Sequence, residues 1–510
     1  MRAISNSVSF LWGATLLLVC AAAFLVIALI SLGIFERVPH VEDEAAYLFQ
    51  AQVFAQGRLS VSTPPYPESY WSPFVVDFQG QRFGKYPPGY PLLLSLGVRL
   101  GRPWIVNALL AALSLWFLAQ LGRVIYSPTT GLIAAALGLT CPVFLAESGT
   151  LLSHTASFFL TVVFLWAFAN LIEVPGGQHN RQAVVAGLAL GFLLITRPYD
   201  ALGVGLPFGL YALAHILHGN RRLLRHGVMV VGIALIFGLM LLVYWRLLTG
   251  QFVNAYRLVW PYDRPGFGPE IGVNGYTLQT GFFLTRLNLR ALSRGWLGWP
   301  GYLNIVLLWA PFLLRPRDRW NYLLLAGFVS VVTVHITYWY YGGHDAGFPR
   351  YYYAALPMLL LLTARGIELV AGSLRSLASR VWPPAKMRAF QISAGCVTLA
   401  LYGAVVALVV YNVVAFLPDN LRAFQGKYGI TAAPLRAVRE AGITGALVFV
   451  TPYETWRDFA IFFAANSPTL DSDVVYAIYR DKTQAQAVKA LYAGRQCYVQ
   501  RRDRLTPCSF

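Results

Sequence analysis

The sequence has few charged residues, and acidic residues are the scarcest of them. Asp, Glu, Lys and Arg make up 12% of its 510 residues, whereas a soluble protein carries about 25%. Hydrophobic residues make up 57%, and the mean hydropathy is +0.55. This composition excludes a soluble globular protein and indicates a polytopic membrane protein. The net charge of +18 is then expected in cytoplasmic loops, so it does not indicate nucleic-acid binding.

Cysteine is also scarce, and two common kinds of site are missing from the sequence. The five cysteines form no C-x-x-C pair, which argues against a structural zinc site. Cys20, Cys141 and Cys396 lie in apolar runs and are predicted core residues. There is no glycine-rich nucleotide-binding loop, no internal repeat and no low-complexity segment. These absences leave the long apolar runs as the main signal.

Apolar runs recur along the chain, and we predict eleven membrane-spanning helices from them. The first run is too long for the apolar core of a signal peptide and has no A-x-A-like cleavage site, so we expect it to be retained. The predicted spans are 10–35, 103–123, 129–148, 151–172, 182–196, 200–217, 227–248, 299–314, 320–341, 351–370 and 391–416.

The short loops between these spans predict the orientation. With a cytoplasmic N-terminus, every short cytoplasmic loop carries Lys or Arg, as the positive-inside rule requires. Examples are "RRLLRH" at 221–226 and "RPRDR" at 315–319. An odd number of spans then places the C-terminus outside. Two large outer loops follow from this topology, 36–102 and 249–298, and both are rich in Pro, Gly, Trp and Tyr.

Two segments of the first outer loop are predicted to be helices along the membrane surface. The segment "EAAYLFQAQVFAQG" at 44–57 has acidic residues at its start and a glycine at its end, which mark the beginning and the end of a helix. Its apolar residues favour an interfacial position. The segment "PGYPLLLSLGVRLG" at 88–101 is too short to span a membrane.

The composition changes after Phe416, where most of the remaining charge begins. "GALVFVT" and "VVYAIY" are predicted buried strands, and "TQAQAVKALYAG" is a predicted helix. We therefore divide the chain into a transmembrane domain, 1–417, and a small extracytoplasmic α/β domain, 418–510. Cys497 and Cys508 lie in this tail, and disulfides persist outside the cytoplasm. We predict a bond between them; the alternative is a buried Cys497 and a free Cys508.

Three consecutive carboxylates, Glu42, Asp43 and Glu44, follow the first predicted span. Taken alone, this acid is typical of a helix N-terminus, which favours carboxylates. The same loop also carries Lys85 and a double proline in "GKYPPGYPLLL" at 84–94. Carboxylates, a basic residue and interfacial helices over a helical bundle suit a reaction on a membrane-bound substrate.

Three motifs together give the sequence a family resemblance. The pair Asp43–Glu44 follows the first span at once, the same loop ends in "KYPPGYPLL", and a late outer loop enters a helix as "FPRYYYAALP" at 348–357. In this order they resemble the GT-C glycosyltransferases, specifically the protein O-mannosyltransferase-like group, related to glycosyltransferase family 39, that includes the aminoarabinose transferases acting on lipid A. The resemblance covers about 1–175 and 335–370. It implies an all-α polytopic membrane protein of GT-C type, here with a small α/β tail.

The resemblance also implies an activity. Members of this group transfer a sugar from a polyprenyl phosphate to an acceptor hydroxyl outside the cytoplasm, with inversion. The sugar, a hexose or a pentose, stays open, and so does the acceptor, which is a lipid, a polysaccharide or a protein. Asp43 matches the family's catalytic Asp and is expected to act as general base. Adjacent helical residues diverge by about 100°, so we expect Glu44 to orient the site or to hold a cation.

A lipid phosphate as leaving group needs cations around it. The candidate phosphate-binding residues are Lys85, Arg197, Arg350, Arg286, Arg290 and Arg294. The last three recur every four residues in "RLNLRALSRGW" and therefore share one helical face, and Arg holds phosphate with two hydrogen bonds. A solvated or headgroup-binding basic face is the alternative for this run. For Arg197 the alternative is a pair with Asp200.

Further candidates for substrate binding flank these residues: Tyr86, His344, Asp345 and Tyr351. His154 stands at the outer end of the fourth predicted span, where several members of the wider family have an acidic residue. The alternative for His154 is a hydrogen-bonded core residue. We therefore assign no metal ligands, although a divalent metal ion stays open as a cofactor.

Two other function classes remain open. A transporter or flippase of lipid-linked sugars needs ionisable residues deep within the spans, whereas the charges here gather at the outer mouths of the spans. A long multidomain tail would favour a ligase that moves whole lipid-linked glycans, and the tail here is short. The expected partners are a lipid-linked sugar donor, an acceptor and membrane lipids, without nucleic acid.

Overall fold

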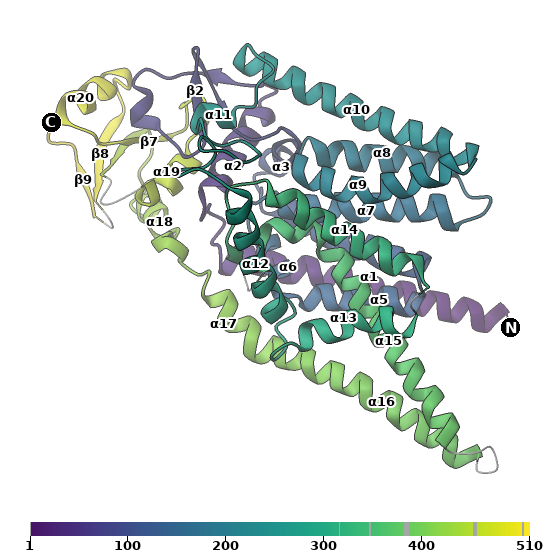
Figure 1. Cartoon of the computed structure of the whole chain (residues 1–510). Helices are drawn as coiled ribbons and strands as arrows, with labels where there is room; N and C mark the ends of the chain where they lie inside the picture. Colours follow the sequence, from purple (N-terminus) through teal and green to yellow (C-terminus); the bar gives the residue numbers. More distant parts are fainter. Residues whose placement is uncertain (1, 316, 346–347, 382–386, 452–455, 502–503) are drawn as a thin grey trace.

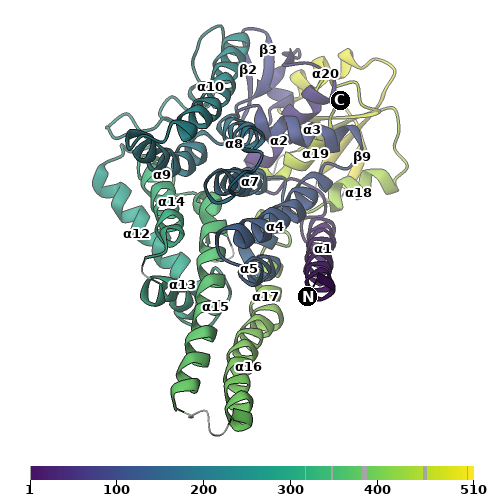
Figure 2. The same ribbon diagram turned by 90° about the vertical axis from the view of Figure 1, so that its right-hand side faces the viewer.

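The computed structural model describes residues 2–315, 317–345, 348–381, 387–451, 456–501 and 504–510 (Figure 1). Long helices form most of the molecule, and a small sheet lies at one end of them (Figure 1). The chain begins at the end of the bundle opposite the sheet (Figure 1). In Figures 1 and 2, α15 and α16 extend side by side beyond the rest of the bundle, away from the sheet.

All eleven predicted spans lie on helices of the bundle. The helices are α1 (Arg2–Gly33), α4 (Ile105–Ile125), α5 (Pro128–Thr140), α6 (Pro142–Gly149), α7 (His154–Glu173), α8 (His179–Leu194), α9 (Pro198–Leu217), α10 (Arg221–Thr249), α13 (Leu303–Leu314), α14 (Arg319–Ile336), α15 (Leu356–Val381) and α16 (Met387–Tyr411), which a π-turn (Asn412–Phe416) extends.

The number of helices that can cross a membrane alone is smaller than eleven. In the described part of the chain, eight helices are long and apolar enough to do so. Helices α5 and α6 make a ninth span only as a pair bent by 60°, where Pro142 has no N–H to continue the helix. The two other predicted spans are short: α8 has 16 residues, and α13 has 12 and contains Pro311. Length therefore supports eight or nine spans.

The outer surface of the bundle is apolar. Helix α10 is the clearest case, since Leu235 and Leu239 are 67% and 61% exposed. Large aromatic side chains fill the interior, among them Phe158, Phe208 and Tyr353, which are fully buried. A continuous apolar surface around a packed core is stable against lipid rather than water. The chain is thus a multi-pass membrane protein.

The two loops predicted to be outer, 36–102 and 249–298, fold over the end of the bundle near the sheet. The first loop contains α2 (Glu42–Ala55), β1 (Val61–Ser62), a 3-10 turn (Pro67–Tyr70), β2 (Val75–Phe78), β3 (Gln81–Gly84) and α3 (Gly89–Arg99), with the strands in the antiparallel order β1-β3-β2. The two predicted surface helices are therefore present as α2 and α3. The second loop contains α11 (Tyr256–Val259) and α12 (Leu278–Gly295), and a later one contains β4 (His344–Asp345), β5 (Phe348–Pro349) and the turn η2 (Arg350–Ala355).

The tail forms a small α/β unit. Its elements are α17 (Leu417–Arg422), η5 (Lys427–Gly429), α18 (Ala433–Glu440), β6 (Ala446–Val450), η6 (Trp456–Asp458), α19 (Ala460–Ala465), β7 (Val474–Ile478), α20 (Lys482–Leu491), β8 (Gln496–Arg501) and β9 (Arg504–Pro507). The sheet order is β7-β6-β8-β9, parallel except for β9. The predicted strands and helix are confirmed as β6, β7 and α20. The division of the chain at residue 417 stays a prediction.

The tail is attached to the first outer loop by specific contacts. The Glu68 carboxylate accepts a hydrogen bond of 2.6 Å from Gln484, and Arg480 donates to the Glu68 carbonyl. Tyr70, from the same outer loop, is buried in the apolar core of the tail. These contacts position the tail over the end of the bundle that the two loops cover.

The predicted disulfide between Cys497 and Cys508 is present, with Cα atoms 5.4 Å apart. It ties the last residues to β8, so that the ring of Phe510 packs 5.5 Å from that of Phe449. We expect a Cys497→Ser, Cys508→Ser variant to lose about 3 kcal/mol of tail stability, since the closed loop restricts the unfolded chain. Mass spectrometry of unreduced, alkylated protein checks the bond. Two alkylated thiols in the tail peptide contradict it.

Candidate functional site

A cavity of about 520 Å³ lies where the outer loops, the bundle and the tail meet. Its walls come from the first turn of α2, the β3–α3 turn, the start of α9, the loop before α12, the segment after α14, η2, and two short pieces of the tail. Charged side chains of both signs line it: Lys85, Arg197, Arg264, Arg350, Lys427 and Arg457 against Glu42, Asp43 and Asp263. The excess of positive charge suits an anionic ligand.

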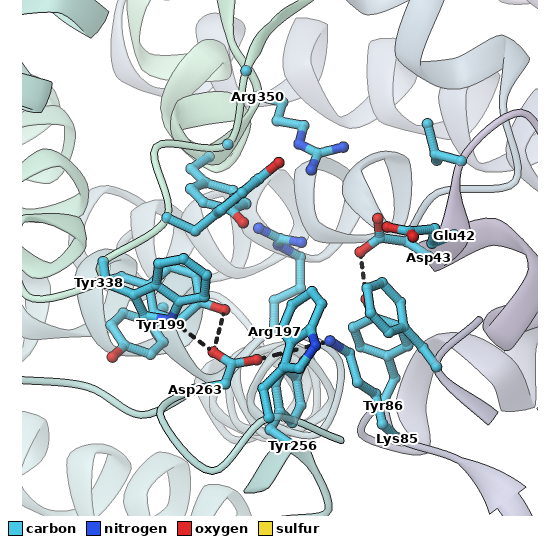
Figure 3. Close-up of a pocket in the computed structure, with 18 of the residues that line it drawn as sticks. Glu42, Asp43, Lys85, Tyr86, Arg197, Tyr199, Tyr256, Asp263, Tyr338 and Arg350 are labelled. Atoms are coloured by element: carbon cyan, nitrogen blue, oxygen red, sulfur yellow. Dashed lines mark hydrogen bonds and ion pairs between the residues drawn. The ribbon is translucent and has the colours of Figure 1, made fainter. Parts of the chain in front are cut away.

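Asp43 points into this cavity from the first turn of α2 (Figure 3). The hydroxyl of Tyr86 donates a hydrogen bond to Asp43 Oδ1. Burial, and then the charge of Asp43, raise the pKa of Tyr86 well above its ordinary value. Tyr86 therefore stays protonated and keeps donating to the carboxylate, which holds Asp43 in one orientation.

Glu42, the preceding residue, also lines the cavity. It was not singled out as a site residue in the sequence. Burial and the neighbouring charge of Asp43 raise the pKa of Glu42, and the cations Lys85, Arg457 and Arg350 oppose this. Two adjacent carboxylates with different surroundings thus face one cavity. The only sequence feature that pointed to Glu42 was its position in the run of three acidic residues, 42–44.

Glu44 does not line the cavity; it is 1% exposed and bonded to backbone groups. Its Oε2 accepts from the N–H groups of His40, at 2.6 Å, and Val41, at 3.2 Å, and its Oε1 accepts from Leu151 N–H at 2.7 Å. Two of these bonds cap the start of α2, and the third ties α2 to the segment between α6 and α7. Of the two roles expected for Glu44, its geometry fits the orienting one.

We expect Glu44→Gln to destabilise the protein rather than to alter the chemistry directly. The amide N–H₂ of Gln faces N–H donors, and a lost hydrogen bond to a charged group costs about 1.5–3 kcal/mol. A lower thermal unfolding midpoint in detergent measures this effect. Glu42→Gln is the matched control, because Glu42 is a neighbour on the same helix without the three backbone bonds, and its midpoint should stay close to that of the wild type.

Lys85 reaches the cavity inside a cage of aromatic rings. Its Nζ lies 3.5 Å from the ring centroid of Phe74 and 4.5 Å from that of Trp260. Its side chain is 3% exposed, and burial lowers the pKa of Lys85, although Asp43, Asp263 and Glu42 oppose the shift. An anion bound next to such a desolvated ammonium stabilises its charged form.

Asp263 is a buried member of the site that the sequence did not single out. Its Oδ1 accepts from Tyr338 Oη at 3.0 Å and from Trp339 Nε1 at 3.1 Å, and its Oδ2 lies 3.7 Å from Lys85 Nζ (Figure 3). The available signal was one carboxylate in the aromatic stretch "VWPYDRPGFG". In the fold, that stretch supplies a partner for Lys85.

Arg197, Arg350 and Tyr351 also line the cavity. Arg197 Nε lies 2.6 Å from Asp200 Oδ2, so the predicted alternative for Arg197 is present as well. Both guanidinium groups lie beside the ring of Tyr351, at 5.8 Å from Arg197 and 5.7 Å from Arg350. Five of the predicted cations and tyrosines are thereby gathered with Asp43 around one space: Lys85, Tyr86, Arg197, Arg350 and Tyr351.

The basic run on α12 is not part of this cavity. Arg286, Arg290 and Arg294 do share one helical face, as expected, but that face is exposed. Helix α12 packs through Gly281, Asn288 and Leu292, which are buried. The phosphate-binding role of the three arginines stays a prediction, and their position fits the alternative, a basic face toward headgroups or solvent.

The remaining predicted residues have other outcomes. The side chains of His344 and Asp345 lie outside the described part of the chain, although their backbones pair with Pro349 and Phe348. His154 is buried against the ring of Tyr353 and does not line the cavity. Over the residues that the structure describes, no three His, Cys, Asp or Glu side chains form a metal-binding group.

Comparisons with known proteins bear on the fold. No protein-family model and no curated protein matches the sequence. Among solved structures, ArnT from Cupriavidus metallidurans bound to undecaprenyl phosphate is similar, with a TM-score of 0.56 and 13% identity over 94% of this chain and 92% of that one. Its apo state gives a TM-score of 0.55 at 15% identity, over 98% and 94%. At such identities the likeness concerns the fold, and it confirms the expected GT-C architecture.

Proposed function

We propose that this chain, which has the GT-C fold, is a membrane glycosyltransferase that uses a polyprenyl-phosphate sugar. It transfers the sugar to an acceptor hydroxyl at the outer face and inverts the anomeric centre. The observation that carries this proposal is the pairing, in one cavity, of a half-buried carboxylate, Asp43, with several cations. ArnT binds undecaprenyl phosphate, and a polyprenyl phosphate is what such a donor leaves behind after transfer.

The proposed reaction is a single displacement. The acceptor oxygen attacks the anomeric carbon opposite the phosphate, the bond from that carbon to the phosphate oxygen breaks, and the phosphate leaves with the electron pair. Asp43 takes the proton of the acceptor hydroxyl, and a positioned base of this kind contributes about 10²–10⁴-fold. Tyr86 orients Asp43 through its hydrogen bond. Glu42, in the same cavity, is a further carboxylate beside the reacting groups.

The leaving phosphate is proposed to bind Lys85 and Arg350. Lys85 provides a partly desolvated point charge, and Arg350 provides a fork of N–H donors that matches phosphate oxygens. Arg197 shares its charge with Asp200 and is proposed to add to the positive field. Tyr351, between the two arginines, is proposed to contact the donor, as are His344 and Asp345. The sugar is a hexose or a pentose in this proposal.

The topology is also proposed: a cytoplasmic N-terminus, and the cavity and residues 418–510 outside. The two ends of the chain lie at opposite ends of the bundle (Figure 1), and the basic loops predict which end is cytoplasmic. Single cysteines introduced in the tail should react with a membrane-impermeant maleimide in intact cells. Labelling only after lysis contradicts this orientation.

One experiment tests the activity. Purified protein is incubated with a panel of radiolabelled polyprenyl-phosphate sugars and membrane extract, with and without EDTA. We expect one labelled monophosphate sugar to be consumed and its label to appear on an acceptor. Movement of a labelled lipid between leaflets without consumption favours a flippase, and consumption of diphosphate-linked glycans alone favours a ligase. The EDTA arm decides whether a divalent metal ion is needed.

A further inference from the structure

A second cavity, of about 620 Å³, lies on the other flank of α2. Leu48 and Gln52 of α2 line it, whereas Asp43 and Tyr47 of the same helix line the first cavity. Among the residues that the structure describes, none lines both cavities. The second cavity, called here the arginine groove, is bounded by the end of α1 with the residues that follow it, α2, the α3–α4 connection, and α18 and α19 of the tail.

The arginine groove lies at the level where spans leave the membrane. Gly33, in its wall, is the last residue of the first span, and Pro103, on the opposite wall, comes two residues before the span of α4. Next to it, Leu96 of α3 and Leu100 directly after α3 are 57% and 70% exposed, as residues in contact with lipid are. Leu48, Val98 and Ile461 give the groove apolar walls. A ligand that enters here therefore comes from the membrane side.

The charge in the groove is predominantly positive. Arg37, Arg436 and Arg439 line it, with Glu36 as the carboxylate among them. Glu36 is engaged: its Oε1 lies 3.0 Å from Arg436 Nη1, and its Oε2 accepts from Ala432 N–H at 2.7 Å. Within the described ranges, no carboxylate lies at ion-pair distance from Arg37 or Arg439. Both side chains are exposed, so two guanidinium groups are available to an anion.

The backbone that carries Arg37 is strained. Glu36 and Arg37 both have left-handed φ angles, 47° and 62°, which residues with a Cβ adopt at a cost. This backbone conformation directs two adjacent, oppositely charged side chains to different places. Glu36 reaches α18, and Arg37 lines the groove. Backbone strain of this kind persists where the surrounding structure fixes it, often at ligand-binding positions.

We propose that the arginine groove binds the phosphate of an anionic phospholipid headgroup, with Arg37 and Arg439 as its ligands. Arginine matches phosphate oxygens with paired N–H donors, and basic pockets beside spans bind anionic headgroups in this way. The apolar walls at the membrane level select a lipid over a free anion. The lipid contacts α1, α2 and the tail together, so it holds the tail against the outer loop. This site is separate from the proposed transfer reaction and does not depend on it.

Native mass spectrometry of the full chain in detergent tests the proposal. The probes are phosphatidylglycerol and phosphatidylcholine, titrated separately and in competition. We expect the wild type to retain phosphatidylglycerol at least tenfold more tightly, and Arg37→Ala, Arg439→Ala to reduce that affinity about tenfold per arginine. The matched control is Arg222→Ala, Arg225→Ala, which removes two exposed arginines from the other end of the bundle and should keep the binding.

Three results overturn the proposal. They are equal retention of the two lipids by the wild type, unchanged retention by the Arg37→Ala, Arg439→Ala variant, and displacement of phosphatidylglycerol by inorganic phosphate at comparable concentration. The last result marks a site for a free anion. A single Arg439→Gln variant repeats the test if the double variant unfolds in detergent. Since lipid binding is the readout, failure here leaves the proposed glycosyl transfer untouched.

Discussion

Asp43→Asn should lower the rate of sugar transfer by about 10²–10⁴-fold, the contribution of a positioned general base. The change keeps the shape of the side chain and its hydrogen bond to Tyr86, but it removes the group that accepts the proton. Folding and binding of undecaprenyl phosphate should be retained. Turnover with the labelled donor found by the panel experiment measures the first effect, and the thermal midpoint with native mass spectrometry measures the other two.

Glu42→Gln is the comparison for this prediction, because Glu42 lies in the same cavity one residue away. If Asp43 is the base, the loss in the Glu42→Gln variant should be clearly smaller. An Asp43→Asn enzyme that kept more than about a tenth of wild-type turnover, against the 10²–10⁴-fold contribution of a base, rules out that role. A larger loss in Glu42→Gln moves the role to Glu42.

Lys85→Met should weaken binding of undecaprenyl phosphate by about ten- to a hundredfold, since a hydrogen bond to a charged group contributes about 1.5–3 kcal/mol. Methionine keeps an apolar chain inside the aromatic cage and removes the ammonium. Binding is measured by titration of the lipid into protein in detergent. Unchanged affinity would show that the phosphate does not contact Lys85.

The same lysine predicts a pH dependence. Because burial lowers the pKa of Lys85, the free protein loses this charge at a lower pH than an ordinary lysine, whose pKa is about 10.4. Lipid affinity of the wild type should therefore fall as the pH rises toward that value from below. Lys85→Arg keeps its charge throughout this range, and its affinity should stay flat. Parallel curves for the two proteins contradict this explanation.

Much of the fold could be predicted from the sequence because lipid imposes simple rules. Long apolar runs predicted the position of every bundle helix in the sequence, and the strand and helix patterns of the tail predicted β6, β7 and α20. Only eight or nine of the eleven predicted spans are long enough by themselves, because apolar composition does not report where a proline divides a helix, as Pro142 does between α5 and α6. Apolar residues before α13 likewise made the predicted span, 299–314, longer than the helix, Leu303–Leu314.

The site was predicted in part, and the misses have a common cause. Several site residues lie in motifs or at helix ends, so they could be named from the sequence: Asp43, Lys85, Arg197 and Arg350. The orientation of a helix is set by its packing, so the sequence could predict that the arginines of α12 share one face but not that this face lies away from the cavity. Asp263 is one carboxylate in an aromatic loop, and only the folded loop brings it to Lys85.

The charged walls of the first cavity come from parts of the chain that are made at very different times. Asp43 leaves the ribosome early, and Arg457 follows roughly 20 to 80 seconds later at 5–20 residues per second. During that interval the cavity lacks Lys427 and Arg457, two of the six Lys and Arg residues that line it. The wall of the cavity that contains Asp43 is therefore complete only once the tail has been synthesised and docked.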